Sequence, residues 1–203
     1  MVKSLSFTDG IEFHFGPDAI LARPLAAAYF ANVVVTWSHI EDQLGELYTL
    51  LTCYWAPRKQ GDRAGIPYSP AAIITFRSLQ VLRTKTELIA KLIDIIATVE
   101  EKENFKRLEG TLRRCSKQRN KVAHGRWGVC EKFPDELILM EETSAVQVYT
   151  AQDFHEISNN MKVLIGKLSA FYHVIYERIK DSPTPEPNGW LFGGTFDEAM
   201  DTE

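Results

Sequence analysis

The sequence lacks the features that mark secreted, redox-active and membrane-spanning proteins. It has three cysteines, none in a Cys-x-x-Cys spacing, and no positively charged segment followed by an apolar run at its start. An odd number of cysteines without a secretory signal is typical of reduced thiols and predicts a cytoplasmic protein. The longest apolar stretch, residues 24–35, contains Asn32 and is too short to cross a bilayer, so we expect no membrane association.

Motifs for the common cofactors are also missing. There is no His-Glu-x-x-His pair and no cysteine-rich cluster, which excludes the usual zinc sites. A Gly-x-x-x-x-Gly-Lys-Ser/Thr segment is absent too, which excludes a P-loop for nucleoside triphosphates. We therefore expect neither a metal nor another cofactor.

Charge is spread unevenly along the 203 residues. The whole chain has a net charge of -4, while residues 181–203 contain six acidic and no basic side chains. Residues 102–132 contain ten Lys or Arg and three Glu, a net charge of +7. Such a basic segment is an electrostatic footprint for a phosphate polymer. The alternative is a solvated helix face held by salt bridges.

Apolar residues recur at steps of three and four over most of the chain, which predicts long amphipathic helices. The first extends from Pro24 to about Tyr54 and is followed by a loop over residues 56–68. Ser69-Pro70 begins a second long helix, and a third spans about residues 101–123 with a break near Gly110. Thr150-x-x-Asp153 has the spacing of a capping box and opens the last helix.

Between the third and last helices the period changes to that of short strands, at residues 126–130, 136–140 and 146–149. The predicted fold class is all-α: an up-and-down bundle of four to five long helices with a small β-hairpin insert before the last helix. Its parts are an N-terminal arm (1–16), a helical bundle (17–180) that includes the insert (126–149), and an acidic tail without fixed structure (181–203).

An arginine interrupts the apolar stripe of the third helix. The stripe is formed by Phe105, Leu108, Leu112, Cys115, position 119 and Val122. A guanidinium at such a position loses hydration and cannot shed its proton, so Arg119 requires an anion. One source is a carboxylate on a neighbouring helix, with Glu41 favoured over Asp42, and the other is a phosphate from outside the chain.

Arg119, Asn120 and His124, at the end of this helix and followed by Gly125, resemble the signature of the HEPN superfamily (higher eukaryotes and prokaryotes nucleotide-binding). That signature is an arginine, often followed directly by Asn or Asp, and then a histidine after four to six residues. The resemblance covers about residues 17–180 and implies a metal-independent endoribonuclease of toxin or defence type. It further implies RNA as substrate, a composite active site at a homodimer interface, and an antitoxin or regulatory protein as partner.

The chemistry of RNA cleavage suggests a role for each residue. His124 would be general base or acid, Arg119 would hold the non-bridging phosphate oxygens, Asn120 would support them, and Glu41 would orient Arg119. Candidates for further RNA contacts are Lys117, Lys121, Arg126 and Trp127. For Trp127 the alternative is that it packs the insert onto the bundle.

Residues 119 and 124 lie about 140° apart around a regular helix. We therefore expect either a distorted helix end or a second subunit that completes the pair. Some proteins with this signature are inactive, which leaves two other functions: a non-catalytic RNA- or protein-binding module, or a structural helical dimer.

Overall fold

The computed structural model describes residues 3–6, 12–16, 18–53, 69–142 and 145–180. Its helices are α1 (Pro24–Cys53), α2 (Pro70–Ser78), α3 (Leu82–Ile96), α4 (Val99–His124) and α5 (Ala151–Ile179). Its strands are β1 (Lys3–Ser6), β2 (His14–Phe15), β3 (Arg126–Cys130), β4 (Phe133–Glu142) and β5 (Ala145–Tyr149). The predicted loop at 56–68 and the predicted acidic tail at 181–203 lie outside the described residues.

The prediction of an all-α fold is wrong, because the helices are joined by an antiparallel sheet with the strand order β1-β5-β4-β3-β2. The predicted insert supplies the three central strands. The predicted N-terminal arm supplies both edges, since β1 pairs with β5 and β2 pairs with β3. The two outer strands of this three-stranded unit, β5 and β3, would otherwise present unpaired backbone groups, and the start of the chain pairs with part of each. The fold is therefore mixed, with helices predominating.

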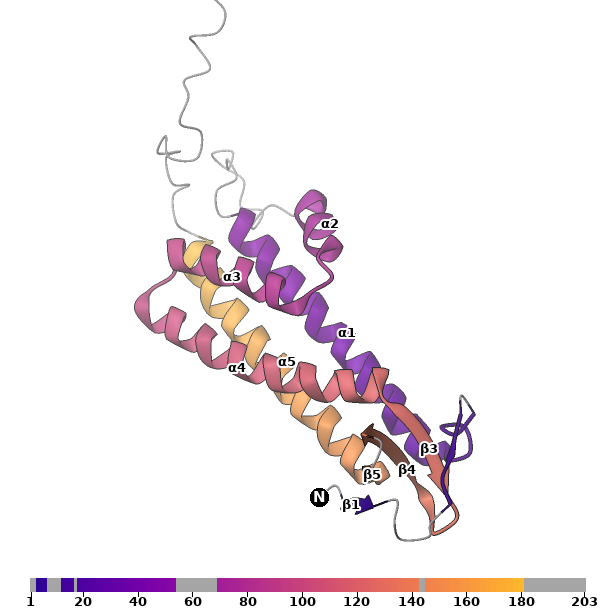
Figure 1. Cartoon of the computed structure of the whole chain (residues 1–203). Coiled ribbons are helices and arrows are strands. Elements are labelled where there is room, and N and C mark those ends of the chain that lie inside the picture. Colours follow the sequence, from indigo (N-terminus) through magenta and orange to yellow (C-terminus); the bar gives the residue numbers. More distant parts are fainter. Residues whose placement is uncertain (1–2, 7–11, 17, 54–68, 143–144, 181–203) are drawn as a thin grey trace, which may run out of the picture.

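Helices α1, α4 and α5 form the body of the molecule, with the sheet at the end where α4 stops and α5 starts (Figure 1). Helix α1 packs against α5 more extensively than any other two elements pack together. Buried side chains between the helices include Trp37, Leu44, Leu112 and Leu164. Within the described part of the chain, no helix is both long enough and apolar enough to span a membrane.

The predicted second long helix is two helices. Ser69 caps α2, its hydroxyl accepting the Ala72 N–H at 3.2 Å, but α2 ends at Ser78 and the chain is extended at Leu79 and Val81 before α3 begins. The Ser78 hydroxyl donates to a carbonyl of the preceding turn, an alternative to helical bonding that favours a helix end. Val81 has no side-chain oxygen, so the first turn of α3 has no side-chain cap.

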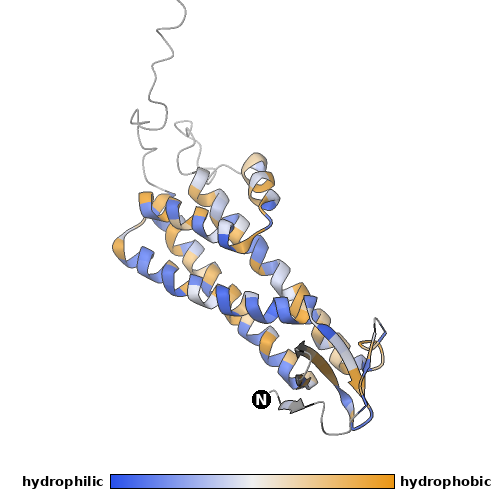
Figure 2. Ribbon diagram, viewed as in Figure 1, coloured by the Kyte–Doolittle hydropathy of each residue, from blue (hydrophilic) through white to orange (hydrophobic). Residues whose placement is uncertain are grey.

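The break predicted near Gly110 is also wrong, because α4 is continuous from Val99 to His124. A capping box of Thr98 and Glu101 starts this helix, and a second one of Thr150 and Asp153 starts α5, as predicted. The ribbon of α4 is largely hydrophilic in Figure 2, and most of the basic segment lies along this helix, whose buried residues form one stripe.

Candidate functional site

The candidate site lies at the end of α4, where the helix passes directly into β3. Gly125 donates its N–H to the Lys121 carbonyl at 2.9 Å and has a φ of -67°, so it is not in the left-handed conformation that often ends a helix. A Cβ at this position would lie 2.4 Å from the Lys121 carbonyl oxygen and 2.4 Å from Leu139 Cδ1. Glycine is needed here for steric reasons, and it keeps α4 regular as far as His124.

Trp127 anchors this helix end to the sheet. Its indole Nε1 donates to the carbonyl of Val122 in the last turn of α4 at 2.9 Å. The ring packs edge-on against Phe30 and Tyr149 and tilted against Phe154, and only 5% of the residue is exposed. The prediction that Trp127 contacts RNA is therefore wrong, and the alternative, packing of the insert onto the bundle, is what the structure has.

The side chains of Arg119 and His124 meet within one chain. Arg119 Nη1 lies 3.3 Å from His124 Nε2 and 3.2 Å from Asn120 Oδ1. The expectation that a distorted helix or a second subunit is needed to bring them together is wrong. The arginine stem is long enough to cross the angle between the two Cα positions, although the helix is regular.

The Arg119–His124 contact indicates which imidazole nitrogen carries the proton when the ring is neutral. A guanidinium can only donate, so Nε2 of His124 must accept, and the proton of the neutral ring is then on Nδ1. The Nε atom of Arg119 is buried and has no hydrogen-bond partner in the described part of the molecule.

Arg119 and Asn120 face a cleft of about 670 Å³ between α1, α3 and α4. Its walls consist of Trp37, Glu41, Gln80, Val81, Leu82, Arg83, Thr86, Glu87, Arg113, Ser116, Lys117, Arg119 and Asn120. Arg83 is paired with Glu87 at 2.6 Å and Arg113 with Glu109 at 2.7 Å. Among the residues that the structure describes, Lys117 and Arg119 have no carboxylate partner, so the cleft keeps cationic groups available for an anion.

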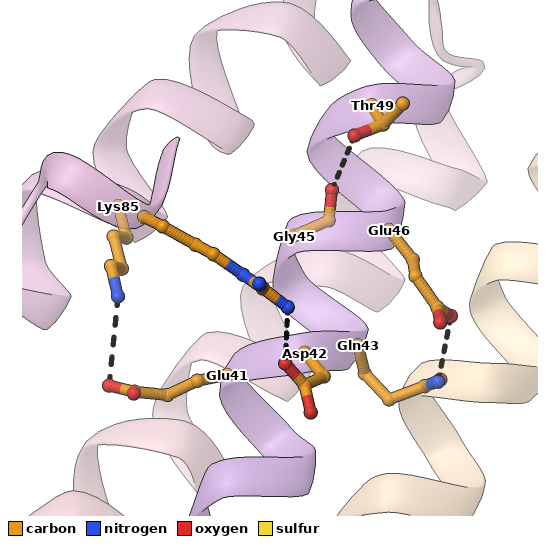
Figure 3. Close-up of polar contacts among 8 residues, drawn as sticks. Glu41, Asp42, Gln43, Gly45, Glu46, Thr49 and Lys85 are labelled. Atoms are coloured by element: carbon orange, nitrogen blue, oxygen red, sulfur yellow. Dashed lines mark hydrogen bonds and ion pairs between the residues drawn. The ribbon is translucent and has the colours of Figure 1, made fainter. Parts of the chain in front are cut away.

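Glu41 lines the same cleft but does not bind Arg119. Its carboxylate pairs with the Lys85 ammonium at 3.7 Å, as Figure 3 shows, and Asp42 pairs with Arg77 at 3.1 Å. The Lys85 side chain is only 7% exposed, whereas Arg119 is partly exposed. The buried ammonium of Lys85 therefore needs a carboxylate partner more than the guanidinium of Arg119 does. The expected Glu41–Arg119 pair is not formed, and no carboxylate in the described part of the chain neutralises the guanidinium.

A second cleft, of about 380 Å³, lies on the other side of the same helix. It is lined by Lys117, Gln118, Lys121, Gln147, Tyr149, Asp153, Glu156, Ile157 and Asn160. Lys117 and Lys121, predicted to contact RNA, are both exposed here, whereas the exposed Arg126 lies over the ring of Phe15 at 5.6 Å, away from both clefts.

Sequence reasoning missed the wall residues that other elements contribute, such as Arg83, Glu156 and Asn160. Their proximity to α4 depends on tertiary packing. One signal was present in the sequence: Lys117, Asn120, Lys121 and His124 have the spacing of a single polar helical stripe.

Comparisons of the chain with protein-family models, with curated proteins and with solved structures find no match. Among the described residues, no group of three or more His, Cys, Asp and Glu side chains is placed to hold a metal ion. The chemistry of the site is therefore inferred from the contacts of Arg119, Asn120 and His124 themselves.

Proposed function

We propose that this protein is a metal-independent endoribonuclease with Arg119 and His124 as its catalytic pair and Asn120 in support. The observation that carries the proposal is the 3.3 Å contact between Arg119 Nη1 and His124 Nε2, beside a cleft with uncompensated cationic groups. A phosphate-binding guanidinium next to a neutral imidazole is the combination that cleavage of a phosphodiester by a neighbouring hydroxyl requires. The HEPN resemblance of the same residues supports this choice.

RNA carries its own nucleophile, the ribose 2′-hydroxyl. In the proposed step the phosphate takes the Nη donors of Arg119, which frees His124 Nε2 to remove the 2′-hydroxyl proton. The 2′-oxygen then bonds to phosphorus while the bond from phosphorus to the 5′-oxygen breaks. The products are a 2′,3′-cyclic phosphate and a 5′-hydroxyl, and DNA cannot react in this way.

The leaving 5′-oxygen needs a proton, which a second copy of the chain would supply. In the homodimer implied by the resemblance, one His124 acts as base and the other, protonated, acts as acid. The exposed position of His124 at the end of α4 is compatible with such a pairing.

The proposal includes a cytoplasmic toxin or defence role with an antitoxin or regulatory partner. It predicts that expression of the wild type, but not of His124→Ala, slows cell growth.

The direct test is cleavage of several labelled RNAs in EDTA by the wild type and by the His124→Ala and Arg119→Ala variants. We expect cleavage only by the wild type, with losses of at least a hundredfold in each variant. Matched controls are His173→Ala and Arg114→Ala, which remove an exposed side chain of the same type outside both clefts. Full activity of His124→Ala would refute the assignment.

The oligomeric state and the alternatives are separated by two further results. In the two-histidine step a mixture of Arg119→Ala and His124→Ala chains stays inactive, because a mixed dimer has only one His124. Regained activity would instead show that one Arg119 and one His124 from different chains are sufficient. Salt-sensitive RNA binding without any turnover by the wild type would instead favour the non-catalytic binding module. If the variants lose only thermal stability and the wild type binds no RNA, the structural dimer is the remaining function.

A further inference from the structure

The two clefts are separated by one ridge of α4. Lys117, Asn120, Lys121 and His124 are spaced at i, i+3, i+4 and i+7, and all four are exposed. Lys117 lines both clefts, Asn120 lines the first and Lys121 the second. A phosphate held at the His124 end of this ridge would therefore have a cleft on each side, one for each of the nucleotides that it joins.

The second cleft differs from the first in chemistry. The first has four cationic side chains against two carboxylates, those of Glu41 and Glu87, and this excess of positive charge favours a phosphate backbone. The second has three side-chain amides and two carboxylates against two lysines. Carboxylates disfavour phosphate but accept hydrogen bonds from base edges, and amides both donate to and accept from them. At about 380 Å³ the second cleft is at the lower end of the usual range for small ligands, about 300–1,000 Å³.

Glu156 and Asn160 are the wall residues best suited to read a base. Both are exposed and lie one turn apart on α5, so they share a face. Asp153, by contrast, is occupied in the capping box, where Oδ2 accepts from the Thr150 N–H at 2.9 Å. Among the residues that the structure describes, Glu156 accepts a single hydrogen bond, an exposed one from Gln152 at 3.2 Å, which a ligand can replace.

We propose that the second cleft binds one of the two nucleotides flanking the scissile phosphate and selects guanine. The Glu156 carboxylate accepts the N1–H and an N2–H of the base, and the Asn160 amide donates to O6. Among the four RNA bases only guanine presents two neighbouring donors on its Watson–Crick edge. Lys117, at the boundary of the clefts, contacts the backbone between them. This inference rests on the proposed ribonuclease function, whose site it extends.

The experiment compares RNA oligonucleotides that carry guanine, inosine or adenine next to the cleavage position. Inosine lacks only the 2-amino group, so it removes one of the two donors to Glu156. We expect the wild type to prefer guanine over inosine about ten- to a hundredfold, and Glu156→Gln to lose that preference. Glu177→Gln is the matched control: it removes an exposed carboxylate from the same helix, outside both clefts, and should keep the preference.

The same comparison is made by binding, with oligonucleotides that carry a 2′-deoxy nucleotide at the cleavage position and so cannot react. Cleavage without base preference would overturn the cleft assignment and leave the ribonuclease function in place. Guanine-selective, Glu156-dependent binding without cleavage would support the cleft assignment and refute the function. If the protein binds guanine and inosine oligonucleotides equally tightly, or binds neither, the assignment of the second cleft to guanine is overturned, whatever the outcome for cleavage.

Discussion

The uncapped start of α3 gives a test in which stability and RNA binding should change in opposite directions. Val81 is the N-cap residue of α3, has extended backbone angles (φ -95°, ψ 120°) and is 59% exposed, so a capping side chain can replace it without strain. It also lines the cationic cleft. The substitution Val81→Asp places a carboxylate where it can accept the free N–H groups of the first turn, and the same charge then faces the cleft.

The expected stabilisation follows from the missing cap. An aspartate in place of an apolar N-cap residue contributes about 1 kcal/mol, which for a chain of this size raises Tm by about 2–4 °C. The added carboxylate also offsets about one cationic contact with RNA. We therefore expect RNA affinity at low salt to fall about five- to tenfold and the slope of log K against log salt to become shallower by about 0.7.

The assay pairs thermal unfolding with fluorescence anisotropy on a single-stranded RNA across a salt series. Val99→Asp is the control, since Val99 is 80% exposed at the start of α4, next to its existing cap and outside both clefts. It adds the same charge and should leave RNA affinity unchanged. A Val81→Asp protein that is more stable and binds RNA as tightly as the wild type would refute the passage of RNA through this cleft.

Four further substitutions test how the fold supports the site. Trp127→Phe leaves a buried carbonyl of α4 without its donor, so we expect a loss of about 1–3 kcal/mol in unfolding free energy and slower RNA cleavage, measured by denaturant titration and by the cleavage assay. Gly110→Ala, where a Cβ meets nothing within 4 Å, should raise the unfolding free energy by about 0.5–1 kcal/mol. Gly125→Ala should lower it, because the added Cβ collides with the backbone. Equal changes in unfolding free energy for both variants would contradict this view of the helix. Burial raises the pKa of Asp153, but hydrogen bonds from Thr150 outweigh this effect, so the pKa is lowered in the folded state. The ionised carboxylate therefore stabilises the fold above the ordinary aspartate pKa, and this stabilisation is lost as pH falls through the lower, folded-state pKa. Asp153→Asn should therefore flatten the acid side of the stability–pH curve, and an unchanged acid slope would contradict the role of the charge.

Helical periodicity predicted most of the bundle because its signal is local. The stripe that begins at Phe105 and the capping boxes depend on neighbours three and four residues away, and those elements are in the structure. Local signals could not show that residues 3–6 and 14–15 complete a sheet built from residues 126–149. The helix break at residues 79–81 was also missed, since neither glycine nor proline marks it.

At the site, the residues that meet were easier to predict from the sequence than the ion pair of Arg119. The motif picked out Arg119, Asn120 and His124, which do meet. The partner expected for Arg119 was wrong, because Lys85 lies deeper and takes Glu41. Competition between two cations for one carboxylate depends on their burial, and burial is a property of the folded chain.

The angle between residues 119 and 124 did not predict their contact, because it describes Cα directions and not the reach of side chains. An arginine has four rotatable bonds before its guanidinium, and here it crosses from one helix face to the end of the helix to meet the imidazole. This contact changes what a second subunit is needed for. If each chain already holds an arginine beside a neutral histidine, a dimer does not have to assemble that pair. Its contribution would be a second titratable histidine, so that one imidazole removes a proton while the other supplies one.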